Sequence, residues 1–97
     1  MIYKLHPSAA SDIAEAARFY RREGGKALAL RFMNEFDRVA NMVALNPGLG
    51  TATDDARRKF PLYDFPFSMI YRPSKSGIEI LVVRHQRRDP DFGNERR

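Results

Sequence analysis

The residues best suited to chemistry stand together near the end of the chain. Arg84, His85, Arg87 and Arg88 directly follow an apolar run of strand type, 78–83. Because a strand inside a sheet cannot easily bury an arginine, the chain must reach solvent within a residue or two of that run. The strand therefore places a basic cluster at the rim of a sheet, where the cluster can bind an anionic or amide-rich target.

His85 gives this cluster a side chain that changes charge near neutral pH, so a general acid or base is one interpretation. The other is a structural hydrogen bond, the commoner role for a lone histidine beside arginines. His6 is the only other histidine and there is no cysteine, so disulfides, thiolate catalysis and cysteine-bound zinc are excluded. We expect no metal and no cofactor. Any catalysis would use His, Arg, Lys and Tyr alone, as in a metal-independent nuclease.

Two other basic segments have open interpretations. Arg57, Arg58 and Lys59 begin a strand, where they could bind phosphates through charge or form a solvated edge that resists aggregation. Tyr71 and Arg72 end a strand and could stack on bases or clamp a phosphate. For Tyr71 the favoured interpretation is a core aromatic.

The net positive charge is confined to one part of the chain. Residues 1–56 carry seven Lys/Arg and seven Asp/Glu, whereas residues 57–97 carry ten Lys/Arg against five Asp/Glu, which accounts for the whole net charge of +5. This asymmetry predicts an anionic partner for the C-terminal part, either nucleic acid or an acidic protein segment. No apolar run is long enough to cross a membrane and no signal-peptide pattern is present, so we expect a cytoplasmic protein.

Two amphipathic helices are predicted before the basic half. Ser8 is expected to cap the first, which Gly24-Gly25 ends. A second, longer helix then runs as far as Asn46. Its apolar stripe consists of Leu28, Phe32, Phe36, Val39 and Val43, and is extended by Met33, Met42 and Leu45 beyond one face. The stripe belongs to the core, and the apolar residues beyond it predict a surface that binds a partner.

The remaining segments alternate with a period of two and predict strands. A short strand covers 1–6, residues 48–55 form a loop, and three strands follow. Their apolar positions are Phe60 and Leu62, then Phe67, Met69 and Tyr71, then Ile78, Ile80 and Val82. The predicted fold is α+β in the order β-α-α-β-β-β, a helical hairpin packed on a mostly antiparallel four-stranded sheet. Residues 1–97 form this single domain, with 91–97 a polar tail.

The chain resembles the RelE/ParE family of bacterial type II toxins, often called plasmid-stabilisation proteins. The matching segments, in chain order, are Asp12 to Tyr20, Leu28 to Glu35, Asn46-Pro47-Gly48, Arg58 to Leu62, Phe65 to Arg72 and Ile80 to Pro90. The resemblance implies the fold described above and growth arrest when the toxin is unpaired. It also implies a cognate antitoxin, acidic and DNA-binding, encoded by the neighbouring gene, with higher-order toxin-antitoxin complexes as a further expectation.

Within this family, ParE-like members are associated with inhibition of DNA gyrase, and RelE-like members cut mRNA on the ribosome. The nucleases usually carry an arginine where this chain has Ser68, and no tyrosine follows Tyr71. The resemblance therefore favours the ParE-like branch. A ribosome-dependent endoribonuclease is the alternative, and an inactive, antitoxin-binding relative is a third.

Site residues follow from these interpretations. The target-binding set is Arg84, His85, Arg87, Arg88, Arg57, Arg58, Arg72 and Phe92, with Phe92 expected to anchor the tail beside the rim. If the protein is a nuclease, the catalytic set is Lys59, Arg58, Arg87 and His85. The antitoxin-binding set is Leu28, Phe32, Met33, Phe36, Met42 and Leu45.

Overall fold

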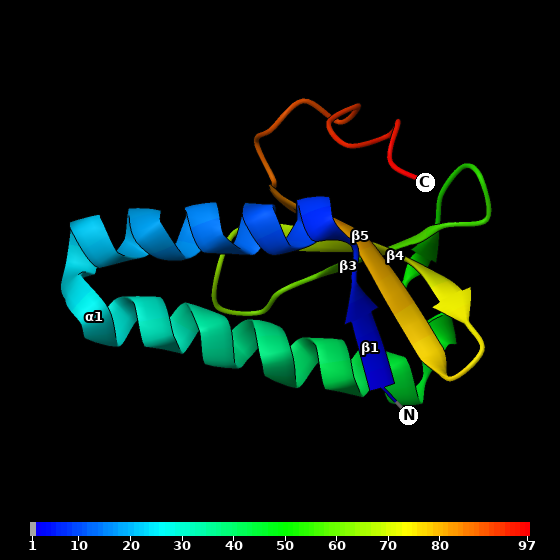
Figure 1. Cartoon of the computed structure of the whole chain (residues 1–97), viewed down its shortest axis with the longest axis horizontal. Helices are drawn as coiled ribbons and strands as arrows, with labels where there is room; N and C mark the ends of the chain where they lie inside the picture. The colour runs from blue at the N-terminus through cyan, green and yellow to red at the C-terminus, as the bar shows by residue number, and fades with distance from the viewer. Residues whose placement is uncertain (1) are drawn as a thin grey trace.

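The helical periodicity of the first half of the sequence forms α1 (Pro7–Leu45), which Gly25 breaks into two halves. Gly25 has φ 85° and ψ −177°, a backbone conformation that a side chain would strain. The two halves, 7–24 and 26–45, lie antiparallel, as the computed structural model of residues 2–97 shows (Figure 1). The predicted helical hairpin is confirmed, with its turn at the predicted glycine pair.

The start of α1 differs from the prediction. Pro7 is the first helical residue, where its missing N–H has no intrahelical partner to lose. His6 takes the capping role predicted for Ser8, because its Nδ1 accepts the Ser8 backbone N–H at 3.1 Å.

Five strands form one mixed sheet. The four predicted strand positions become β1 (Ile2–Leu5), β3 (Arg58–Pro61), β4 (Phe67–Ser74) and β5 (Gly77–His85). A 3₁₀ turn, η1 (Pro47–Leu49), and a two-residue strand, β2 (Thr51–Ala52), occupy the predicted loop. The predicted count of four strands was therefore one too few, because two residues are too short to show a periodicity.

The spatial order of the strands is β1-β5-β4-β3-β2, with β1 parallel to β5 and the other neighbours antiparallel. β1 pairs only with residues 77–80 of β5, and Leu5 lies opposite Ile80. The edge of β5 from Leu81 onward therefore has no strand beside it, and other groups must satisfy its backbone.

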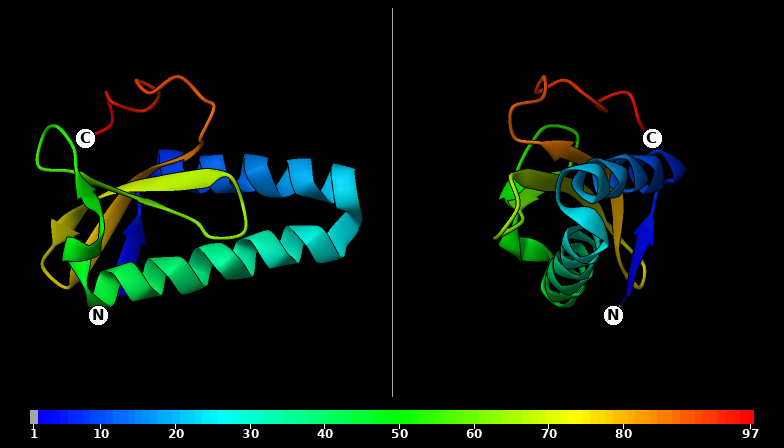
Figure 2. Two further views of the ribbon diagram at one scale, coloured as in Figure 1. Left: turned by 180° about the vertical axis from the view of Figure 1, so that it is seen from behind. Right: turned by 90° about the vertical axis from the view of Figure 1, so that its left-hand side faces the viewer.

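The main core lies between the helical hairpin and one face of the sheet. Phe32 is fully buried there, with Tyr20, Phe65 and Phe67 around it at ring-centroid distances of 5.3 Å each. Phe65 comes from the β3–β4 loop, which extends along one face of the helical hairpin (Figure 2). Aromatic contacts thus fix the spacing of the hairpin relative to the sheet.

Glu35 ties the same loop to α1. It is only 8% exposed. Its carboxylate accepts hydrogen bonds from the backbone N–H groups of Tyr63 and Asp64 at 2.9 and 3.2 Å, and it forms an ion pair with Arg38 at 2.7 Å. Burial by itself would raise the pKa of Glu35, but these donors together lower the pKa below its ordinary value of 4.5.

The opposite face of the sheet carries a smaller apolar cluster of Ile70, Leu81 and Val82, and Phe92 packs against it. Gly93 follows with φ 83°, and a Cβ there would lie 2.6 Å from a Val82 methyl group. Residues 89–97, which include the predicted polar tail 91–97 and which we call the tail, therefore lie directly on the sheet. The views agree in placing it beside the first half of α1, away from the second (Figures 1 and 2).

Candidate functional site

A groove of about 260 Å³ lies between the first half of α1, the end of β5 and the tail; we call it the cationic groove. Four arginines from three parts of the chain line it: Arg18 and Arg22 from α1, Arg84 from β5 and Arg88 from the following turn. The other lining residues are Asp12, Glu15, Ala16, Phe19, Phe67, Val83, His85 and Phe92. The groove therefore combines cations with aromatic walls.

The end of β5 positions the predicted basic cluster. Phe67 lies opposite His85 in the ladder and their rings contact edge to face, with centroids 5.2 Å apart. The Arg87 backbone N–H donates to His85 Nδ1 at 3.0 Å, and the Arg88 N–H donates to the His85 carbonyl at 2.9 Å. His85 thus closes the turn that presents Arg87 and Arg88 to solvent, as its structural interpretation predicts.

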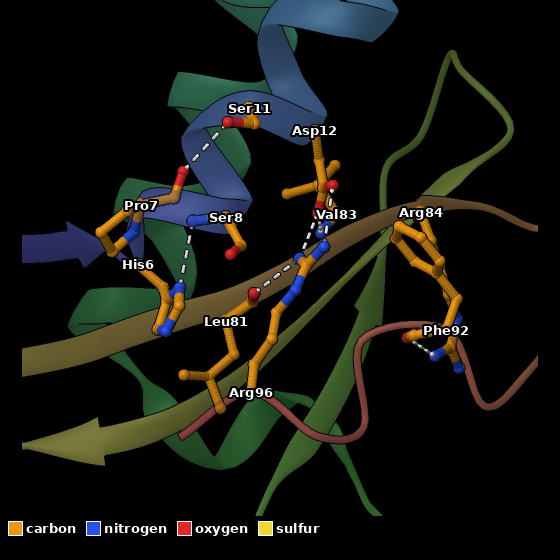
Figure 3. Close-up of polar contacts among 10 residues, drawn as sticks. All are labelled: His6, Pro7, Ser8, Ser11, Asp12, Leu81, Val83, Arg84, Phe92 and Arg96. Atoms are coloured by element: carbon orange, nitrogen blue, oxygen red, sulfur yellow. Dashed lines mark hydrogen bonds and ion pairs between the residues drawn. The ribbon is translucent and has the colours of Figure 1, made fainter.

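The uncovered edge of β5 is satisfied by Asp12 and Arg96. The Val83 N–H donates to Asp12 Oδ2 at 3.0 Å, and Arg96 donates both to the Leu81 carbonyl at 3.0 Å and to the same Asp12 carboxylate at 2.5 Å (Figure 3). The two side chains of the ion pair are only 12% and 8% exposed. The pair joins the tail, the helix and the strand on one wall of the cationic groove.

Other arginines hold the tail in place. Arg84 Nη1 donates to the Phe92 carbonyl at 3.2 Å, and the Arg88 guanidinium lies 4.1 Å from the centre of the Phe92 ring (Figure 3 shows Arg84 and Phe92). Phe92 does anchor the tail beside the rim, as expected.

Arg57 differs from the expectation of a basic surface. It is only 8% exposed and donates to the backbone carbonyls of Asn94 and Arg96. Its place in the target-binding set stays a prediction, but its contacts are those of a residue that fastens the tail. These two carbonyls lie almost forty residues from Arg57 along the chain, so no local sequence pattern could have predicted its burial.

A second, smaller hollow of about 50 Å³ lies beside the groove. Lys59, Ser68, Arg84, Gln86, Arg88 and Pro90 line it. Arg84 and Arg88 therefore face both hollows, and Lys59 is the one member of the 57–59 basic run that reaches this site.

The residues predicted for the nuclease alternative are not brought together in either hollow. His85 lines the cationic groove, Lys59 lines the second hollow, and neither Arg58 nor Arg87 lines either one. Arg58 instead donates to the Gly50 carbonyl at 2.7 Å. The nuclease assignment stays an untested prediction.

Tyr71 and Arg72 were predicted to end a strand, but they lie inside β4, which pairs with β5 as far as Ser74, and both have internal partners. Tyr71 is fully buried; its hydroxyl donates to the Pro47 carbonyl at 2.6 Å and accepts the Gly50 N–H at 2.8 Å. Burial, outweighing that hydrogen bond, raises its pKa above 10.0. The favoured core interpretation of Tyr71 is confirmed. Arg72 pairs with Glu79 on the adjacent strand at 2.8 Å, so its guanidinium is already engaged.

The predicted antitoxin-binding set divides by burial. Phe32 and Phe36 are 0% and 3% exposed and belong to the core, so including them was wrong: a partner cannot touch them without opening the fold. Leu28 and Met42 are partly buried against the core. Met33 and Leu45 are 43% and 70% exposed and remain available.

The sequence interpretation missed the contribution of the first helix. Arg18, Phe19 and Arg22 lie at exposed positions of the first helix, where such residues usually form a solvated face. Their spacing of one helical turn was the only available signal. Arg96 was also missed, because nothing in the sequence connects it with Asp12.

Within residues 2–97, no group of His, Cys, Asp or Glu is arranged to hold a metal ion. In the same part of the chain, no helix is both long and apolar enough to cross a membrane.

Comparison with known families identifies the class of protein. Residues 3–90 match the model described as the ParE toxin of the type II toxin-antitoxin system parDE. Because the match spans most of the chain, this protein belongs to the ParE toxin family. The predicted resemblance is thereby confirmed on its favoured branch.

A solved structure shares the fold. A chain described as the chromosomal ParDE TA system from P. aeruginosa superimposes with a TM-score of 0.77 at 24% sequence identity, covering 88% of this chain and 95% of that one. None of the curated proteins matches the chain. Residues 91–97, including Phe92 and Arg96, lie beyond the family match.

Proposed function

We propose that this protein is a toxin that arrests growth by inhibiting DNA gyrase and is neutralised by a cognate antitoxin in the cytoplasm. The observation that carries the proposal is the ParE family match over residues 3–90. The fold shared with a chain of the ParDE system of P. aeruginosa agrees with it.

The contacts of the polar residues favour inhibition by binding over RNA cleavage. Metal-independent cleavage requires a base, an acid and a cation on one phosphate, within hydrogen-bond reach of the reacting atoms. Here Arg58 is bonded to Gly50, Tyr71 is buried, and His85 Nδ1 accepts a backbone N–H. Ser68 lines the second hollow, where an arginine would be expected in a nuclease of this family.

The target-binding surface in this proposal is the rim formed by Arg84, His85, Arg87 and Arg88. Arg87 and Arg88 are exposed on a turn that backbone bonds hold rigid. Guanidiniums carried by a turn whose backbone is held in this way can make charge-assisted hydrogen bonds to a protein target.

The proposed antitoxin segment is acidic and amphipathic. Its carboxylates would pair with the basic C-terminal part of the chain, and its apolar face would cover Met33 and Leu45 together with Leu30, which is 53% exposed. Contacts of both kinds are typical of a partner that covers a toxin surface.

Controlled expression in bacteria tests the proposal. We expect replication to stop and DNA-damage signalling to rise while mRNA stays intact, and co-expression of the neighbouring gene should restore growth. Rapid cleavage of mRNA within translated codons would overturn the proposal in favour of the nuclease alternative. Normal growth with a folded, abundant chain would favour the inactive relative.

A further inference from the structure

Among residues 2–97, no carboxylate forms an ion pair with any of the four arginines of the cationic groove, although Arg84 also donates to the Phe92 carbonyl and Arg88 stacks on the Phe92 ring. Arg18 and Arg22 are four residues apart, about 6 Å along the helix axis, and Arg84 and Arg88 approach the same groove from β5 and its turn. Among residues 2–97, the ion pairs join Arg38 to Glu35, Arg72 to Glu79 and Arg96 to Asp12, and include none of these four.

Few acidic side chains in the groove offset the charge of these arginines. Of the two carboxylates that line the groove, Asp12 is already bound by Arg96 and by the Val83 N–H, which leaves Glu15 alone. The groove therefore has a net positive charge, and burying more of its surface against a neutral or cationic ligand would be unfavourable.

Positively charged side chains also lie beyond the groove. Arg84 and Arg88 also line the second hollow, where Lys59 joins them. We call the five residues Arg18, Arg22, Arg84, Arg88 and Lys59 together the cationic track. Charges repeated along a path suit a ligand with regularly repeated charges better than a single anion.

Aromatic side chains lie along the same track. Phe19 is 46% exposed at the groove although it is a large apolar residue, and the Arg88 guanidinium is held over the Phe92 ring. Exposed aromatic rings and stacked guanidiniums beside phosphate-binding cations are the combination that binds single-stranded nucleic acid.

We propose that the cationic track binds single-stranded nucleic acid. Arg18, Arg22, Arg84 and Arg88 bind successive phosphates, and a base stacks on Phe19. Binding needs no cleavage. The track shares Arg84 and Arg88 with the rim proposed to bind gyrase, but the variants that test it, at Arg18, Arg22 and Phe19, lie outside that rim, so either proposal can fail alone.

The test is fluorescence anisotropy of a labelled 12-nucleotide oligothymidine titrated with the full-length chain over a range of salt concentrations. Four phosphate contacts predict a slope of about −3 in a plot of log affinity against log salt. The Arg18→Gln/Arg22→Gln variant should reduce that slope by about 1.4 and the affinity by about tenfold. Phe19→Ala should weaken binding by about tenfold without changing the slope.

The matched control is Arg21→Gln/Lys26→Gln. It removes two positive charges from the same hairpin at exposed positions that do not line the groove, and should lower the affinity less than threefold. Circular dichroism checks that each variant is folded. An equal loss in the control would show general charge attraction only and would overturn the proposal.

Two competing ligands complete the test. If a polyglutamate peptide of equal charge displaces the oligothymidine at equal or lower concentration, the track is a site for acidic protein segments and the proposal is wrong. It is equally wrong if a duplex of the same length binds as tightly as the single strand and Phe19→Ala has no effect on either. Stronger binding of the single strand than of both competitors supports it.

Discussion

At the scale of single residues, polar groups removed from solvent hold the irregular segments of this fold to its regular elements. Glu35 binds the β3–β4 loop and Tyr71 binds the segment 47–50. In each case one side chain satisfies backbone groups that no strand or helix reaches, and buried groups left unsatisfied would each cost about 1–3 kcal/mol.

Glu35→Gln should therefore lower the free energy of unfolding by about 1–3 kcal/mol at pH 7, because the amide loses the ion pair to Arg38 and weakens the bonds to the loop. The pKa of Glu35 is lowered in the folded state, so its stabilising effect is present above its ordinary pKa of 4.5 and is lost as the pH falls through the folded value. Urea denaturation at several pH values measures this.

The matched control is Glu23→Gln, an exposed carboxylate on the same helix. Its effect should stay within about 0.5 kcal/mol at every pH. A difference between the wild type and Glu35→Gln that stays constant from pH 7 to pH 3 would show that the carboxylate charge plays no part.

Tyr71→Phe tests whether this tyrosine is structural or catalytic. Without the hydroxyl, the Pro47 carbonyl and the Gly50 N–H lose a buried partner, and unfolding should become easier by about 1–3 kcal/mol. At a temperature where the variant is still folded, toxicity per folded molecule should equal that of the wild type. Loss of toxicity in a fully folded variant would contradict the structural role.

At the scale of elements, the tail completes the sheet. β1 ends beside Ile80, and the Asp12–Arg96 pair then satisfies the uncovered edge of β5. Breaking a buried ion pair by removing one partner leaves an uncompensated charge, which costs several kcal/mol.

Arg96→Ala should lower the free energy of unfolding by about 3 kcal/mol and speed hydrogen exchange at the Val83 amide, because Asp12 stays buried without its partner. Adding Asp12→Asn should recover part of the loss, since the stranded charge is removed. Arg97→Ala is the control, as an exposed arginine next in sequence. Equal stability of the Arg96 and Arg97 variants would show that the tail is not held by this pair.

The sequence predicts elements better than it predicts contacts between them. The apolar stripe through Phe32 and Phe36 and the glycine pair were sufficient to predict the hairpin, because helical periodicity is a local property. The burial of Arg57 and the pairing of Asp12 with Arg96 depend on chain segments far apart in sequence, and they arise only when the tail lies on the sheet.

At the scale of the whole molecule, the candidate site is assembled from three regions. Arg84 and Arg88 were predictable because a strand ends beside them, whereas Arg18 and Arg22 join them only through the packing of the hairpin on the sheet. The excess of positive charge in residues 57–97 thus lies next to cations from a region that is neutral overall.

Replacing Arg87 and Arg88 with alanine should separate folding from toxicity. Both are exposed, and the stacking of Arg88 on Phe92 is worth about 1 kcal/mol or less, so the unfolding midpoint should change little. Growth arrest should weaken strongly, because several charge-assisted contacts to the target are lost together.

The control, Arg21→Ala/Lys26→Ala, removes the same charge from the far end of the first helix half and its turn, and should remain as toxic as the wild type. If the Arg87/Arg88 variant is folded and fully toxic, the target binds elsewhere, and the exposed apolar residues of α1 become the next candidates.

The central claim is that the protein acts on DNA gyrase. Its most direct test is a supercoiling reaction with purified gyrase, relaxed plasmid and ATP, to which the full-length chain is added in increasing amounts. We predict that supercoiling stops at near-equimolar toxin, and that the Arg87→Ala/Arg88→Ala variant requires at least tenfold more. Undiminished supercoiling at a large excess of folded, toxic wild-type protein would contradict the account.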